Sequence, residues 1–110
     1  MKEKIIDVKE LPIKTELKNQ LKFSVEFNCL VMIFGSPNGE MVGDGFHSNW
    51  EGTYNDEPFN IYPRVCESEF DLCINTDWYI AAKNYDVAYG LLEYIMKCRE
   101  ENNQKREKEG

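Results

Sequence analysis

Hydrophobic and polar residues alternate most regularly between Leu21 and Cys29, where every second residue is apolar. A period of two predicts a β-strand with one buried face. The apolar run Leu30–Phe34 follows directly and predicts that the strand continues with both faces covered. Ser36–Gly39 then fits a bulged hairpin turn, with proline at its second position and glycine at its last. We therefore expect a returning strand that ends at His47.

The second half of the chain predicts another strand and a helix. Between Phe70 and Ile74 apolar residues again occupy every second position, and Trp78–Ala81 fits the antiparallel partner of this strand. From Asn84, which suits a helix cap, apolar residues recur at helical spacing as far as Met96. Residues 48–60 combine aromatic residues with Asn, Gly and Pro, and this composition predicts a long loop.

Together these elements predict an α+β fold, in which an antiparallel sheet of four to five strands carries one carboxy-terminal helix on one face. Residues 1–100 are expected to form a single compact domain, and the wholly polar residues 101–110 a frayed tail. The second face of the sheet then needs a cover, which the aromatic loop, the amino-terminal segment or another protein chain would provide. Its predicted apolar side chains are Leu30, Met32, Phe34, Val42 and Phe46.

Charge is distributed unevenly along the chain. The net charge is −7, and residues 26–96 hold twelve acids against only Arg64 and Lys83, whereas both ends are slightly basic. Binding to phosphates needs clustered lysine and arginine, so we expect no direct contact with nucleic acid. No apolar run is long enough to suggest a membrane span and no secretory signal is evident, which predicts a cytoplasmic protein.

No set of residues forms a recognisable catalytic or metal site. His47, the only histidine, falls at the end of a predicted strand, with no nucleophile or second ligand placed beside it. The cysteines include no C-x-x-C pair, so we interpret them as free thiols: Cys29, Cys66, Cys73 and Cys98. Phosphate-binding and hydrolase motifs are missing as well. We expect a protein that is not an enzyme and that uses neither a cofactor nor a metal.

One set of carboxylates has a defined predicted geometry. Glu67, Glu69 and Asp71 share a face of the predicted second strand, so that neighbouring carboxylates would lie about 6.6–6.8 Å apart. Such a row can imitate the phosphates of a nucleic-acid strand, although a solvated sheet face has the same pattern. Together with acids and aromatic residues of the preceding loop, the predicted partner-binding residues are Trp50, Glu51, Tyr54, Asp56, Glu57, Glu67, Glu69 and Asp71.

In size, negative charge and lack of catalytic motifs the chain resembles phage-encoded inhibitors of bacterial defence, including anti-CRISPR proteins. The resemblance is one of composition and includes no family motif. It implies a small acidic inhibitor or interaction protein that presents a phosphate-like face to a basic nucleic-acid-binding protein, such as a host-defence nuclease. The alternative is a homo-oligomeric module, a homodimer through the apolar sheet face, whose small-ligand pocket would be lined by Met32, Phe34, Phe46 and Trp50.

Overall fold

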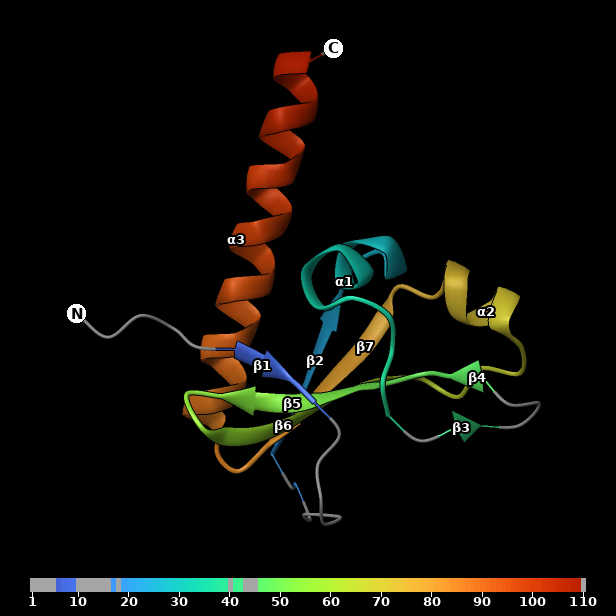
Figure 1. Ribbon diagram of the computed structural model, residues 1–110, viewed down its shortest axis with the longest axis vertical. Helices are drawn as coiled ribbons and strands as arrows, with labels where there is room; N and C mark the ends of the chain where they lie inside the picture. The colour runs from blue at the N-terminus through green and yellow to red at the C-terminus, as the bar shows by residue number, and fades with distance from the viewer. Residues whose placement is uncertain (1–5, 10–16, 18, 40, 43–45, 110) are drawn as a thin grey trace.

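Five strands form one antiparallel sheet in the computed structural model, which describes residues 6–9, 17, 19–39, 41–42 and 46–109. Three consecutive strands form a meander in the middle of this sheet, and two strands from the amino-terminal part of the chain form its edges (Figure 1). In spatial order the strands are β1 (Ile6–Val8), β5 (Trp50–Tyr54), β6 (Glu57–Pro63), β7 (Asp77–Ala82) and β2 (Asn19–Ser24).

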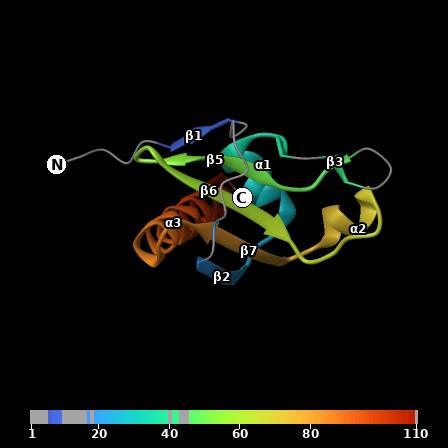
Figure 2. The same cartoon turned by 90° about the horizontal axis from the view of Figure 1, so that it is seen from below.

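Helices and a short ribbon complete the described chain: α1 (Phe27–Phe34), α2 (Glu69–Ile74), α3 (Tyr85–Glu109), and β3 (Met41–Val42) paired with β4 (Phe46–His47). The helix α3 lies along the sheet and its carboxy-terminal half projects beyond it, whereas α2 and the ribbon lie at the opposite end of the molecule (Figures 1 and 2). The predicted α+β class, the antiparallel sheet and the carboxy-terminal helix packed on it are confirmed. The sequence did not predict the two shorter helices.

The core lies between one face of the sheet and the helices α1 and α3. Trp50 and Trp78 have no exposed surface, and their ring centroids lie 5.5 Å apart in an edge-on arrangement. Phe27 of α1 contacts both rings, at 5.9 and 6.2 Å. Leu91 and Ile95 of α3 are fully buried in the same cluster. Because α1 and α3 share these contacts, they cover the same face of the sheet.

The other face of the sheet is mainly polar. By strand alternation, the described side chains on it include Lys22, Ser24, Glu51, Thr53, Asn60, Tyr62 and Tyr79. The apolar residues expected there lie elsewhere: Leu30 and Phe34 are buried in the core, Met32 is exposed on α1, and Val42 pairs with Phe46 in the small ribbon. The predicted apolar second face is therefore wrong.

The segment Phe27–Phe34 is a helix, so the predicted strand is correct only as far as Ser24. Four of its core residues follow the helical spacing i, i+3, i+4, i+7, namely Phe27, Leu30, Val31 and Phe34, and Cys29 and Ile33 also pack against the core. The helix ends at Gly35, whose φ of 84° suits glycine. Ser36–Gly39 consequently joins a helix to β3, and the predicted hairpin turn there is wrong. The returning strand expected to pair with residues 30–34 is wrong as well, because β3 and β4 pair with each other, although His47 does lie at the end of a strand, β4.

Residues 48–60 were predicted to form a loop, but most of them form the hairpin of β5 and β6. Asn55 and Asp56 make its two-residue turn and have φ values of 49° and 69°, as a type I′ turn requires. Gly52 allows β1 to pair on the outer side of this hairpin, because a Cβ atom there would clash with the carbonyl oxygen of Asp7. The hairpin therefore supplies the second and third strands of the five-stranded sheet.

The helix α3 begins as predicted, with the Asn84 side chain accepting a hydrogen bond of 3.0 Å from the backbone N–H of Val87. Gly90 lies against Tyr54 of β5, since a Cβ atom at this glycine would lie 3.0 Å from the tyrosine hydroxyl. The helix continues to Glu109, through the residues predicted to be a polar tail, and their fraying stays a prediction. Among the described residues, no helix is long and apolar enough to cross a membrane.

Candidate functional site

The most exposed large hydrophobic side chains of the described chain lie in α2 and in the segment that leads into it. Val65, Phe70 and Ile74 are 90%, 74% and 59% exposed. Two further exposed residues of this region, Glu67 and Glu69, carry carboxylates. We call these five residues the α2 surface. They lie at the end of the molecule farthest from α3 (Figure 1).

Local hydrogen bonding explains why this segment is helical. The Ser68 hydroxyl accepts a hydrogen bond of 3.1 Å from the backbone N–H of Asp71, and this serine-x-x-acid spacing is that of a capping box. The predicted second strand is therefore wrong, because Glu69–Ile74 forms α2. As a consequence Glu67, Glu69 and Asp71 do not share a strand face, and the evenly spaced row of carboxylates is wrong as well.

Asp71 is held by groups of its own segment. Its carboxylate accepts hydrogen bonds from the Arg64 guanidinium at 2.9 and 3.4 Å and from the backbone N–H of Glu67 at 3.0 Å. These hydrogen bonds, the Arg64 one first, lower the pKa of Asp71 from its ordinary value of 3.8. The side chain thus ties the approach to α2 onto the helix, and we assign it a structural role.

The far end of α2 is fixed as well. Asn75 is buried, its side-chain amide donates to the carbonyl oxygen of Asp77 at 2.7 Å, and its side-chain oxygen accepts from the backbone N–H of the same aspartate at 3.2 Å. The backbone N–H of Asn75 also donates to Leu72 at 3.1 Å. Specific hydrogen bonds therefore fix both ends of this short helix, the first end to Arg64, which directly follows β6, and the last end to Asp77 of β7.

The apolar side chains of α2 point mostly outward. Leu72 is 3% exposed and belongs to the core cluster. At 100° per residue, Phe70 lies about 160° around the helix from Leu72, while Cys73 and Ile74 lie on the same side as Phe70. Glu69 borders this outward side. The usual arrangement of a surface helix, with its apolar side inward and its polar side outward, is therefore largely reversed.

The remaining predicted acids lie away from the α2 surface. Glu51 is on the polar face of the sheet, Asp56 is in the turn of the β5–β6 hairpin, and Glu57 pairs with Lys83 at 3.8 Å. The length of β6, seven residues or about 20 Å, separates the hairpin turn from the segment before α2. The structure thus distributes the predicted acids over both ends of the sheet.

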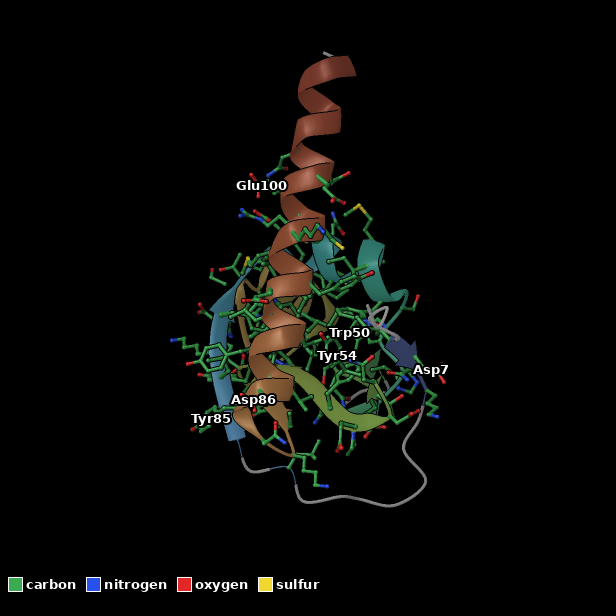
Figure 3. All side chains as sticks on the ribbon, turned by 90° about the vertical axis from the view of Figure 1, so that its left-hand side faces the viewer. Asp7, Trp50, Tyr54, Tyr85, Asp86 and Glu100 are labelled. Carbon is green, nitrogen blue, oxygen red and sulfur yellow. The ribbon has the colours of Figure 1, made fainter. Side chains whose placement is uncertain are left out.

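Trp50 and Tyr54 belong to the core. Trp50 has no exposed surface and its ring N–H donates to the carbonyl oxygen of Gly35 at 2.9 Å, while Tyr54 is 8% exposed (Figure 3). Both side chains are buried, so neither is exposed as the anchor that was expected to meet a partner. The alternative ligand pocket loses Trp50 and Phe34 for the same reason. The side chain of Phe46, its third aromatic member, lies outside the described residues.

The acidic middle of the chain has few cationic side chains, and these form ion pairs with acids of the same segment. Arg64 and Lys83 are the only cations among residues 26–96. They pair with Asp71 at 2.9 Å and with Glu57 at 3.8 Å. Ten further carboxylates of this segment have no cation of the segment to offset them, although one of them, Glu26, pairs with Arg99 of α3 at 2.9 Å. The segment therefore carries a net negative charge.

The remaining reactive or metal-ligating side chains are either hydrogen-bonded or not clustered with one another. The Nδ1 atom of His47 donates to the carbonyl oxygen of Gly39. The Cys66 thiol donates to the carbonyl oxygen of Arg64 at 3.3 Å, and burial raises the pKa of Cys66 and of Cys29. No group of three or more His, Cys, Asp or Glu residues that could hold a metal ion occurs in the part of the chain that the structure describes.

A cavity of about 250 Å³ lies between α1 and α3. Arg99 lines it, but its guanidinium donates to both carboxylate oxygens of Glu26, at 2.9 and 3.1 Å. The two charges offset each other, so the cavity favours neither an anion nor a cation. Met32 and polar amides form much of the remaining lining. We therefore regard the α2 surface as the candidate functional site.

Comparison with known proteins finds no matching family model, no matching curated protein and no matching solved structure. Function is therefore inferred from the charge distribution and from the α2 surface.

Proposed function

We propose that this protein is a small acidic, non-enzymatic interaction protein that binds a basic protein and blocks its contact with nucleic acid. The observation that supports this proposal most is the excess of acids in residues 26–96, where twelve acids face two cations and both cations are paired with acids of the same segment. A negative field of this kind attracts a surface rich in lysine and arginine and accelerates association with it. Such surfaces are typical of nucleic-acid-binding proteins, including host-defence nucleases.

The proposal depends on charge complementarity and on an apolar anchor, and it needs no regular row of carboxylates. Phe70 is the aromatic side chain most exposed in the described chain, and interfaces typically combine an aromatic centre with a polar rim. Resemblance in size and charge to phage-encoded inhibitors of bacterial defence supports the inhibitory role. The four free thiols agree with a reducing compartment, so we propose a cytoplasmic location.

A capture experiment tests this function. Tagged protein is incubated with a bacterial lysate and washed at low and high salt, with DNA or RNA added to half of the samples. We expect a basic nucleic-acid-binding protein that both salt and nucleic acid release. A partner that nucleic acid does not release would contradict the inhibitory role, and recovery of only the chain itself would contradict the proposal as a whole.

A further inference from the structure

We infer that the α2 surface is the docking site for a basic protein segment, which inserts an apolar side chain beside Phe70 and Ile74 and places lysine or arginine against Glu67 and Glu69. This inference depends on the proposed function, because it names the surface and the partner chemistry through which that function works. Three properties of the surface support it: its apolar exposure, its charge and its rigidity.

The most exposed large apolar side chains are concentrated in one short segment of the chain, residues 65–74. Val65, Phe70 and Ile74 exceed every other large hydrophobic side chain of the described residues in exposed fraction. The next most exposed are Tyr85 and Tyr89 on α3. Their rings are in contact with each other, with centroids 6.2 Å apart. A single exposed apolar residue is ordinary, but several in one segment with acids between them are typical of an interface.

Charge complementarity identifies the kind of partner. Glu67 and Glu69 are exposed in the same short segment as the apolar side chains, and the one cation of this segment, Arg64, already pairs with Asp71. A second acidic protein would be repelled, and so would a second copy of this chain at its net charge of −7. A basic segment gains binding free energy from two kinds of contact. Its apolar side chain is buried against Phe70 and Ile74, and its cations pair with the carboxylates at the rim.

Rigidity makes this surface suitable for binding. The Ser68 cap, the ion pair of Asp71 with Arg64 and the buried side chain of Asn75 hold α2 at both ends. Leu72 anchors its inner side in the core. The outward side chains are therefore presented by an ordered backbone, so that binding loses little further conformational entropy.

A defined probe tests the docking site without a known partner. The probe is a 14-residue peptide of leucine and lysine with leucines at helical spacing, titrated into isotopically labelled protein and followed by residue-resolved amide NMR. We expect shifts concentrated in residues 65–74. A peptide with glutamate in place of lysine, and one with serine in place of leucine, should each bind at least tenfold more weakly.

Matched variants separate local from overall charge. The double variant Phe70→Ala with Ile74→Ala should weaken binding of the lysine–leucine peptide tenfold or more. The pair Glu67→Gln with Glu69→Gln should weaken it about fivefold at low salt and flatten its salt dependence. The control pair Glu100→Gln with Glu101→Gln changes the net charge by the same amount on α3, which lies on the other side of the molecule from α2 (Figure 1), and should stay within twofold of the wild type.

Each outcome of the titration decides the inference. Equal weakening by the two charge pairs, or shifts centred on α3, would overturn the docking site while the proposed function could still succeed in the lysate capture. Absence of binding to the lysine–leucine peptide would overturn the docking site as well. Shifts in residues 65–74 that depend only on protein concentration would replace the basic segment by a second copy of the chain.

Discussion

At the scale of single residues, Asp71 shows how one carboxylate can be withdrawn from function by its neighbours. From the sequence, Asp71 was expected to contact a basic partner. In the structure its carboxylate accepts hydrogen bonds from the Arg64 guanidinium and from the backbone N–H of Glu67. Glu67 and Glu69, four and two positions earlier, stay exposed. The difference comes from the capped turn at Ser68, which points Asp71 back toward the preceding segment.

This engagement predicts a pH dependence for Asp71. Because its pKa is lowered in the folded protein, its contribution to stability is present above the unfolded pKa and is lost as the pH falls through the folded pKa. The stability difference between wild type and Asp71→Asn should therefore be constant near neutral pH and shrink below about pH 4. Urea unfolding at pH 7, 5 and 3 measures it. Arg64→Gln should remove most of the same pH-dependent part, and a difference that grows toward pH 3 would contradict the assignment.

Trp78 is a second residue whose role the structure makes specific. Its ring N–H donates to the carbonyl oxygen of Val25 at 2.9 Å in the buried core. Trp78→Phe leaves that carbonyl without its donor, so the free energy of unfolding should fall by about 1–3 kcal/mol. Tyr79→Phe, on the polar face of the same strand, should change it by less than about 0.5 kcal/mol. Denaturant unfolding of both variants checks this, and equal effects would contradict it.

At the scale of elements, the sequence allowed correct prediction of a strand over residues 21–24 and of the start of α3, because each pattern has one clear period. It also predicted β7 as a strand, but with the wrong partner, since β7 pairs with β2 and β6 and the expected partner, residues 70–74, lies in α2. It misled for α1 and α2, where apolar residues occur at both strand and helix spacing. In α1 the spacing of Phe27, Leu30 and Phe34 was a helical signal, but the alternation before it dominated. In α2 the capping-box spacing at Ser68 was the available signal for a helix. It was outweighed by the alternation of Phe70, Leu72 and Ile74, which is typical of a strand, because Phe70 and Ile74 were assumed to be buried.

The Ser68 cap of α2 should make a measurable contribution to stability. Ser68→Ala removes the acceptor for the Asp71 backbone N–H, so it should lower the free energy of unfolding by about 1 kcal/mol and increase hydrogen exchange at that amide. Ser36→Ala, in the exposed loop after α1, is the matched control and should leave both quantities nearly unchanged. Unaltered protection of the Asp71 amide would show that the cap does not hold the helix.

At the scale of the whole molecule, the sequence predicted an acidic body but could not place its acids in space. Placement depends on the β5–β6 hairpin, which puts Asp56 and Glu57 at one end of the sheet and the α2 surface at the other. The aromatic residues of the predicted loop became core for the same reason, since alternate positions of β5 face inward. Of the predicted binding residues, only Glu67 and Glu69 belong to the α2 surface.

The projecting half of α3 gives a prediction about the domain as a whole. Among residues 85–103, the part of this helix whose side chains are described, Ile95 is the last fully buried residue, and the helix continues to Glu109. Deleting residues 104–110 should therefore change the free energy of unfolding by less than about 0.5 kcal/mol, while the circular dichroism loses helical signal. Unfolding or aggregation of the shortened chain would show instead that the domain extends beyond residue 100.

The burial of both tryptophans has a practical consequence for every experiment above. Trp50 and Trp78 are the only tryptophans, they are in contact, and neither has exposed surface. Their emission should be blue-shifted in the folded protein and move to longer wavelength on unfolding. The α2 surface contains no tryptophan, so a lysine–leucine peptide that binds there should leave the emission almost unchanged. Fluorescence can thus report the integrity of the fold in the same sample in which another signal reports docking.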